Sequence, residues 1–151
     1  MDAPRKRATM DRMSGPRSGD GWAATSLDEL GDGPGFRKIR GAIGVTAFGI
    51  NAIVLPPGAE TGRHYHDRQQ EVYFVHRGSL AMELGDGEQI ALEPGSVVRV
   101  DAPTVRLLRN TGDADAVYVV AGGLDGYVGR DGRLPEGETE RHRRSAPPAE
   151  A

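Results

Sequence analysis

Residues 58–78 read GAETGRHYHDRQQEVYFVHRG, and this stretch decides both the fold and the chemistry that the sequence predicts. It contains three of the four histidines in the chain of 151 residues. His64 and His66 are separated by one residue, so both side chains point to one face if the backbone is extended. Glu71 follows closely enough to return a carboxylate on the next strand. Two imidazoles and one carboxylate form a facial donor set for a transition-metal ion, whereas a His-x-His pair without that context is more often an exposed polar strand.

The residues after Glu71 alternate in the manner of a β-strand. If Glu71 points inward, a period of two places Tyr73 on the same face and His76 on the opposite face. Tyr73 can then present its hydroxyl to a ligand, or fill the core with that hydroxyl hydrogen-bonded. His76 is a poor candidate for joining the other two histidines at one ion.

The sequence on both sides of this stretch continues as short extended segments separated by glycine and proline turns. The predicted strands are 42–55, 62–66, 71–76, 79–84, 88–92, 96–100, 104–109 and 116–121. No convincing helix separates them, which favours an antiparallel sandwich or closed barrel over a parallel α/β sheet. The 22 glycines and 10 prolines also argue against a helical bundle. We therefore predict an all-β domain over residues 36–128.

The spacing Gly58-x5-His64-x-His66-x4-Glu71-x6-Gly78 resembles the first motif of the cupin superfamily at every fixed position. This resemblance implies the antiparallel jelly-roll barrel of a small single-domain cupin, with His64, His66 and Glu71 pointing into the barrel. It implies that these three residues hold a divalent metal ion such as Fe, Mn, Ni or Zn. Cupins commonly dimerise through their strands, so the resemblance also implies a homodimer.

The second cupin motif, G-x5-P-x-G-x2-H-x3-N, is matched at Gly95 and Asn110 with the register intact. Its middle differs, because Asp101 stands in place of the proline and Pro103 in place of the second glycine. Arg106 occupies the position of the third histidine ligand. A guanidinium is always protonated and has no lone pair, so Arg106 cannot be a metal ligand.

Three arrangements of Arg106 are open at this point. If the guanidinium points at the triad, metal affinity suffers, because a charge about 5 Å from a divalent ion repels it by roughly 6–7 kcal/mol at an effective dielectric near 20. Arg106 can instead take the place of the metal and pair with Glu71. It can also turn to the barrel mouth and bind a carboxylate or phosphate while a metal remains beneath. A metal site and a metal-free site are therefore both compatible with the sequence.

Composition and charge exclude several classes of protein. The chain has no cysteine, which rules out disulfide scaffolds, thiolate nucleophiles and zinc fingers. The 19 Lys and Arg against 22 Asp and Glu give a formal charge of −3, which argues against nucleic acid as a partner. The sequence has no apolar run long enough to cross a membrane and no apolar core of a signal peptide near its start, so we predict a cytoplasmic location.

The two ends of the chain are polar and rich in turn formers. Residues 1–35 combine glycine, proline, serine and charged residues, and residues 129–151 are similarly polar. Such composition buries too little apolar surface to fold alone. We predict a disordered N-terminal arm over 1–35 and a disordered C-terminal tail over 129–151, on either side of the cupin-like domain.

The functional expectation is the binding of a small, anionic molecule in the barrel interior, contacted by Arg106 and Tyr73, with a metal at His64, His66 and Glu71 or without one. A metal-dependent oxidoreductase of the dioxygenase type, or an isomerase, is one alternative, because the resemblance to cupins includes such enzymes. A non-catalytic structural or sensor protein is the other. Whether the protein is an enzyme is therefore left open, since fold does not fix function.

Overall fold

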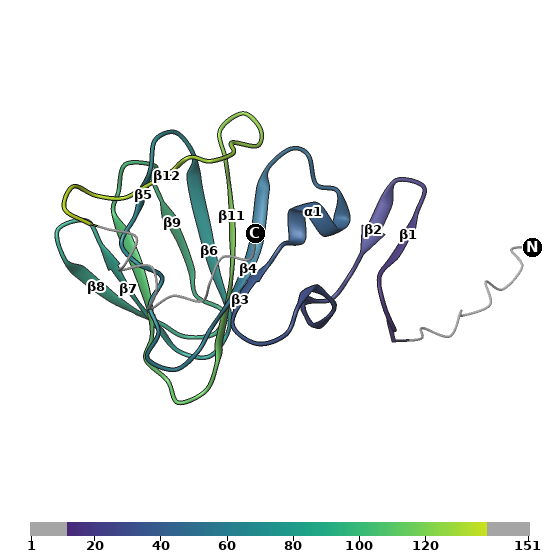
Figure 1. The fold of residues 1–151 in the computed structure, drawn as a ribbon, viewed down its shortest axis with the longest axis horizontal. Coiled ribbons are helices and arrows are strands. Elements are labelled where there is room, and N and C mark those ends of the chain that lie inside the picture. The colour runs from purple at the N-terminus through teal and green to yellow at the C-terminus, as the bar shows by residue number, and fades with distance from the viewer. Residues whose placement is uncertain (1–11, 139–151) are drawn as a thin grey trace, which may run out of the picture.

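The computed structural model describes residues 12–138 and contains two antiparallel β-sheets that face each other (Figure 1). The larger sheet has the strand order β3 (Gly35–Arg37), β4 (Gly49–Leu55), β11 (Ala116–Gly123), β6 (Gln70–Arg77) and β9 (Val97–Val100). The smaller sheet has the order β10 (Arg106–Asn110), β7 (Leu80–Leu84) and β8 (Glu88–Leu92). The predicted all-β jelly roll is confirmed, as two sheets that are paired separately rather than one continuous hydrogen-bonded ring.

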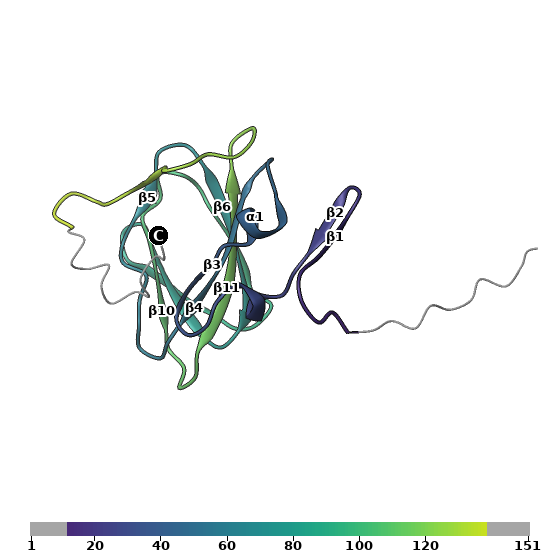
Figure 2. The ribbon, with the colours of Figure 1, turned by 45° about the vertical axis from the view of Figure 1, so that its right-hand side comes forward.

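Two short pairs complete the strand set. β5 (Tyr65–His66) pairs with β12 (Gly132–Arg133), and both lie beside the main sheets (Figure 1). β1 (Arg17–Gly19) pairs with β2 (Trp22–Ala24) in a hairpin that projects from the body of the molecule, as Figures 1 and 2 show. The 3-10 helix η1 (Leu27–Leu30) connects this hairpin to β3, and the helix α1 (Ile39–Ile43) connects β3 to β4.

The core fills the space between the two sheets. Along β6 the burial alternates, with Tyr73 and Val75 at 3% and 1% exposure and the intervening Phe74 at 41%. This is the inward and outward alternation that a period of two predicts. The buried apolar cluster draws on both sheets and comprises Ile53, Leu55, Tyr73, Val75, Leu80, Met82, Leu92, Val100, Leu108, Ala116 and Tyr118.

Two motif residues have structural roles in the turns. Gly78 adopts φ 82°, and a Cβ at this position would lie 2.8 Å from the Cα of Ala116, so the turn before β7 requires glycine. The side chain of Asn110 is buried, and its Nδ2 donates to the carbonyls of Leu55 and Ala114 at 2.8 Å each. Its Oδ1 accepts the N–H of Gly112. The amide therefore fixes the loop that joins β10 to β11.

The N-terminal part of the domain differs from the sequence prediction. The extended segment predicted from residue 42 begins only at Gly49, because residues 39–43 form α1 and residues 44–48 form the turn and bend that follow it. This helix ends at Gly44, whose left-handed conformation, φ 70°, suits the C-cap position of glycine. The remaining predicted strands are present with small shifts at their ends.

Regular structure also occurs within both segments that were predicted to be disordered. Residues 12–35 include the β1–β2 hairpin and η1, and residues 132–133 form β12. β3 attaches the first segment to β4, with Arg37 only 6% exposed. Residues 1–11 and 139–151 lie outside the described residues, and the division of the chain at residues 36 and 128 stays a prediction. Within residues 12–138, no helix has the length and apolarity needed to cross a membrane.

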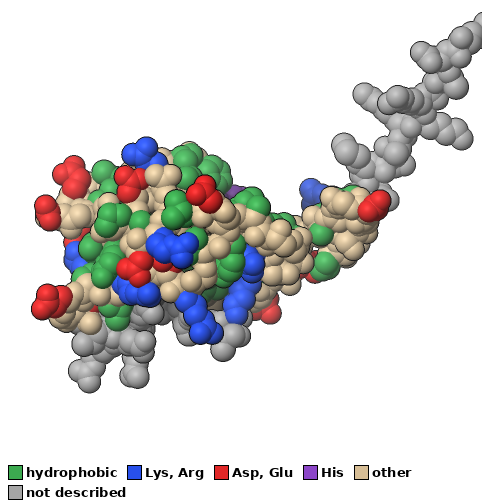
Figure 3. Space-filling view, turned by 90° about the horizontal axis from the view of Figure 1, so that it is seen from above, with side chains coloured by type: hydrophobic (Ala, Val, Ile, Leu, Met, Phe, Trp, Pro, Cys, Tyr) green, Lys and Arg blue, Asp and Glu red, His purple; other side chains and the backbone are tan. Residues whose placement is uncertain are grey.

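Figure 3 shows the charge distribution on the face seen from above. Acidic and basic side chains are interspersed there among apolar ones. That face therefore presents no extended surface of a single charge sign.

Candidate functional site

The structure brings His64, His66 and Glu71 together in the interior. One potential ligand atom from each of the three side chains lies within 4.8 Å of the other two. Glu71 comes from the inner face of β6 and is 7% exposed, and His66 comes from β5 and is 8% exposed. The imidazoles of His64 and His66 lie edge to face with centroids 5.5 Å apart. These three residues are called the His–His–Glu group below.

His64 is placed by a backbone bridge to the first residue of β10. Its N–H donates to the carbonyl of Arg106 at 3.0 Å, and the N–H of Arg106 donates to the carbonyl of His64 at 2.8 Å. Residues in such a directly paired position have neighbouring side chains on one face. The pairing therefore sets the guanidinium beside the imidazole, where the second cupin motif has a histidine.

The neutral form of His64 is strongly favoured. Burial lowers the pKa of His64 to about 4, although a hydrogen bond between Nδ1 and the carbonyl of Gly62, at 3.3 Å, and the nearby Glu71 charge oppose this shift. Near neutral pH the imidazole is therefore uncharged. A neutral imidazole has a lone pair that it can give to a metal ion.

Glu71 is an ionised carboxylate held by several donors. Tyr73 donates its hydroxyl to Oε2 at 2.5 Å, and His66 Nε2 lies 3.1 Å from Oε1. Burial is the largest single influence and by itself raises the pKa of Glu71, but the hydrogen bonds from His66 and Tyr73 and the electrostatic interactions with His66 and Arg106 together lower it. The Glu71 side chain has space because residue 122 is glycine, since a Cβ at Gly122 would lie 3.0 Å from the Cγ of Glu71.

Tyr73 points inward, as the strand period predicts. Burial raises the pKa of its hydroxyl well above the usual value, and the Glu71 charge adds to this effect. The hydroxyl therefore stays protonated and donates a hydrogen bond to Glu71.

Arg106 has no exposed surface and points into the interior. Its Nη2 lies 3.8 Å from Glu71 Oε2, which is an ion pair without a short hydrogen bond. Its two terminal nitrogens also donate to the carbonyls of Ala102 and Asp101 at 3.4 and 3.3 Å, while Nε has no partner. The guanidinium therefore points at the His–His–Glu group, as in the first two of the three arrangements that the sequence leaves open, and not to the barrel mouth.

Two further polar residues contact His66, and sequence reasoning did not select either of them. Gln69 Nε2 lies 3.0 Å from His66 Nδ1, and Asp131 Oδ2 lies 3.7 Å from the same nitrogen. Asp131 is 6% exposed and accepts the N–H groups of Arg68 and Gln69 at 2.9 and 2.8 Å. Burial by itself raises the pKa of Asp131, but these two backbone hydrogen bonds and neighbouring positive charges lower it. No local pattern in the polar tail marks Asp131, because β12 is only two residues long.

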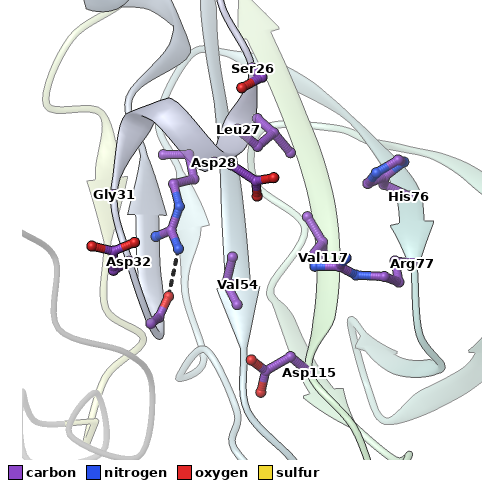
Figure 4. Close-up of a pocket in the computed structure, with 12 residues that line it drawn as sticks. Ser26, Leu27, Asp28, Gly31, Asp32, Val54, His76, Arg77, Asp115 and Val117 are labelled. Carbon is purple, nitrogen blue, oxygen red and sulfur yellow. Dashed lines mark hydrogen bonds between the residues drawn. The ribbon is translucent and has the colours of Figure 1, made fainter. Parts of the chain in front are cut away.

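His76, which the sequence made a poor candidate, lies outside this group on the outer face of β6. Arg99 is also outside it, because its side chain is exposed and pairs with Asp101 at 3.3 Å. A cavity of about 500 Å³ lies on the outer face between the N-terminal segment and the larger sheet (Figure 4). Its charged lining mixes both signs, namely Asp28, Asp32, Arg37, Arg77 and Asp115, so it favours no class of ligand.

The donor set of the His–His–Glu group suits a divalent transition-metal ion. Two imidazoles and a carboxylate leave further coordination positions open. With neutral imidazoles, the carboxylates of Glu71 and Asp131 outnumber the guanidinium of Arg106 by one charge. The repulsion between Arg106 and a cation is thereby offset within the cluster. The residues present therefore fit a divalent ion.

Comparisons with known proteins place this geometry in context. A family model described as a cupin domain matches residues 52–122. The chain is 28% identical over 65 residues to the oxalate-binding protein of Thermotoga maritima, covering 43% of this chain and 53% of that protein. It is 29% identical over 77 residues to a Streptomyces cyaneus protein named polyketide synthase CurC, covering 51% of this chain and 49% of that protein. The chain thus spans about half the length of the curated relatives it matches.

Solved structures agree with the fold. A sugar phosphate isomerase of the cupin superfamily from Silicibacter pomeroyi is 28% identical with a TM-score of 0.54, and the match covers 70% of this chain and 60% of that one. An uncharacterised Klebsiella pneumoniae protein with a double-stranded β-helix domain matches with a TM-score of 0.63 at 19% identity, over 75% of this chain and 96% of that one. The second match supports the architecture alone.

Proposed function

Because residues 52–122 make this chain a member of the cupin superfamily, we propose that it binds a divalent transition-metal ion and, beside that ion, a small carboxylate-bearing molecule. The observation that carries this proposal is the convergence of His64, His66 and Glu71 within 4.8 Å of one another in the interior. Iron, manganese, nickel and zinc are the candidate ions for this donor set.

Charge explains why a cation and then an anion suit the site. The buried carboxylates of Glu71 and Asp131 exceed the Arg106 guanidinium by one negative charge when the imidazoles are neutral. A divalent cation reverses the sign of the cluster to one net positive charge. Buried charge needs compensation, so the metal-loaded cluster attracts an anion. The ion supplies Lewis acidity when bound.

The protein's own residues orient the anion in this proposal. Arg106 keeps one unpartnered donor, Nε, and has only long hydrogen bonds to backbone carbonyls. A guanidinium binds a carboxylate through two parallel hydrogen bonds. Tyr73 holds the other oxygen of Glu71, which keeps that carboxylate aligned with His66. The relative named oxalate-binding protein makes oxalate a suitable probe for this class of ligand.

An isomerase is the second candidate function. The solved relative described as a sugar phosphate isomerase, at 28% identity, favours an anion that carries phosphate rather than carboxylate. In that case Arg106 binds the phosphate and Glu71, near His66, serves as the proton acceptor. If a sugar phosphate binds the metal-loaded protein with saturation and oxalate does not bind, the result selects this candidate.

Metal content tests the first half of the proposal. We expect tag-free protein that is loaded with Mn²⁺ or Zn²⁺ and desalted to retain about one equivalent of metal, and His66→Ala to retain less than about a tenth. His76→Ala is the matched control, because this histidine lies on the outer face of β6, and it should behave as the unmodified protein. Less than about a tenth of an equivalent in the unmodified protein contradicts the proposed metal site.

Ligand-induced stabilisation tests the second half. Oxalate should raise the thermal unfolding midpoint of the metal-loaded protein, and Arg106→Ala should abolish that shift. Arg99→Ala is the matched control, since the Arg99 side chain is 69% exposed in its surface ion pair. If oxalate raises the unfolding midpoint of the metal-free protein as much as that of the metal-loaded protein, the result supports the metal-free form of the site. In that form Arg106 and Glu71 alone organise the anion.

We also propose that the protein acts as a homodimer. The support is an apolar surface on the outer face of the larger sheet, where Phe74 and Val97 lie opposite each other and are 41% and 64% exposed. β9 is the last strand of that sheet, so its outer edge is unpaired among the described strands. The cytoplasmic location stays a prediction from the sequence.

A further inference from the structure

The segment that follows β11 crosses to the other side of the fold and contacts the His–His–Glu group. Figures 1 and 2 show residues 124–138 running from the end of β11 towards β5. There β12 pairs with β5 in the register Gly132 to His66 and Arg133 to Tyr65. A methyl group at Gly132 would lie 3.7 Å from Cε1 of His66. This segment, called the strap below, therefore lies directly against a proposed metal ligand.

Asp131 is the charged residue that the strap brings to the interior. The residue is 6% exposed, and its Oδ2 accepts the N–H groups of Arg68 and Gln69 at 2.9 and 2.8 Å. Its carbonyl accepts the N–H of Asp67 at 3.3 Å. Both side-chain bonds hold one oxygen, Oδ2, which lies 3.7 Å from Nδ1 of His66, slightly beyond hydrogen-bond distance.

The two nitrogens of His66 face different groups. Nε2 faces Glu71 Oε1 at 3.1 Å, on the side of the His–His–Glu group. Nδ1 faces away from it, towards Gln69 Nε2 at 3.0 Å and Asp131. A neutral imidazole that gives the Nε2 lone pair to a metal must carry its proton on Nδ1. That proton needs an acceptor. Gln69 presents its amide nitrogen, a donor, to Nδ1 in this structure, so either the Gln69 amide turns to present its oxygen or the Asp131 carboxylate accepts the proton.

We propose that Asp131 is a positioning residue that accepts the Nδ1 proton of His66 and thereby holds its Nε2 lone pair towards the metal. This inference rests on the proposed metal-binding function and adds the strap to the site. Carboxylates that hydrogen-bond a metal-ligating histidine fix its tautomer and orientation. Asp131 is the carboxylate near Nδ1 among the described residues, because Glu71 lies at the other nitrogen.

A purely structural role is the competing explanation. Asp131 also fixes the turn at residues 67–69, so its loss could loosen the strap without any effect through Nδ1. Arg133 offers a matched control, because its Nε contacts Asp67 Oδ2 at 2.8 Å and so anchors the same strap from an exposed position. Asp131→Asn keeps an oxygen for the backbone N–H groups and removes the charge that faces Nδ1.

Zinc titration calorimetry on the full chain separates these explanations. We expect Asp131→Asn to weaken Zn²⁺ binding by about 10- to 100-fold, and Arg133→Ala to change it by less than about twofold. Equal affinity in Asp131→Asn and the unmodified protein overturns the inference but leaves the proposed function intact. Equal losses in both variants also overturn it, because they show a strap that acts only structurally. If the unmodified protein binds no zinc, the result contradicts the proposed function itself.

The tautomer of His66 gives a readout that does not depend on any variant. In ¹⁵N-labelled, zinc-loaded protein, long-range ¹H–¹⁵N correlation should show His66 protonated at Nδ1 and bound to zinc through Nε2. A zinc-loaded His66 that is protonated at Nε2 overturns the inference, even if Asp131→Asn fails to fold.

Discussion

Arg106 distinguishes this site from a four-ligand metal centre. It stands opposite His64 in the bridge between residues 64 and 106, with no exposed surface, and its Nη2 is 3.8 Å from Glu71. A histidine at this position would extend from the same backbone bridge beside His64. The residue type, and not the backbone, therefore limits the number of donors.

The substitution Arg106→His tests that explanation. It removes a positive charge near the proposed ion and adds a fourth donor, so we expect metal affinity to rise by at least about tenfold. Titration calorimetry with Zn²⁺ or Ni²⁺ measures this change. Arg109→His is the control, because Arg109 lies on the same strand but pairs with Glu60 at the surface. Unchanged affinity in Arg106→His contradicts the placement of the guanidinium at the metal site.

His64 predicts how stability depends on pH in the metal-free protein. Its pKa in the folded state is about 4, below the ordinary value of 6.5, so the unfolded chain binds the proton more readily. The stability that comes from neutral His64 is fully present above pH 6.5 and is lost as the pH falls towards 4. Between pH 7 and pH 5 the loss amounts to about 2 kcal/mol.

Urea denaturation at several pH values measures that loss. His64→Gln should unfold with a flatter pH dependence than the unmodified protein in this range. His76→Gln, which alters an outer-face histidine, should keep the original slope. Parallel curves for His64→Gln and the unmodified protein contradict a buried, neutral His64.

At the scale of single elements, β6 was the most predictable part of the chain. Its alternation placed Glu71 and Tyr73 inward and His76 outward, and the burial pattern agrees. The start of β4 was not predictable in this way, because the apolar residues Ile39, Ala42 and Ile43 suit both a helix and a strand. β12 was missed for another reason. Two residues have no period, and their pairing with β5 depends on tertiary contacts.

The turn before β7 gives a prediction at the same scale. Gly78→Ala places a methyl group 2.8 Å from the Cα of Ala116 and forces a positive φ of 82° on alanine, so we expect a loss of about 2 kcal/mol or more in unfolding free energy. Gly85→Ala also has a positive φ, 53°, but has open space around it, and should lose only about 1 kcal/mol. Denaturant unfolding compares the two, and equal losses contradict the close contact at Gly78.

At the scale of the whole molecule, the sequence indicated the fold class and the His–His–Glu group but not the surroundings of that group. Strand spacing and the first motif led to the jelly roll and to His64, His66 and Glu71. The sequence could not predict that Arg106 lies beside Glu71, because the direction of a long side chain depends on neighbours from other strands. Asp131 was missed because the polar composition of the tail hides its burial against β5.

The outer face of the larger sheet gives the prediction for assembly. We expect the unmodified protein to elute as a dimer in size-exclusion chromatography with light scattering, and Val97→Glu to shift it to a monomer. Leu124→Glu is the control, because Leu124 is also exposed, at 49%, but lies in the loop after β11. A dimer that persists in Val97→Glu contradicts an interface at β9, and a monomeric unmodified protein contradicts the homodimer.

The central claim is that His64, His66 and Glu71 hold one ion together. A crystal structure of the manganese-loaded protein with an anomalous difference map tests it most directly. The account predicts one interior peak about 2.0–2.3 Å from a nitrogen of each histidine and an oxygen of Glu71. A fully occupied manganese peak elsewhere, or an interior without any peak in protein that retains manganese, contradicts it.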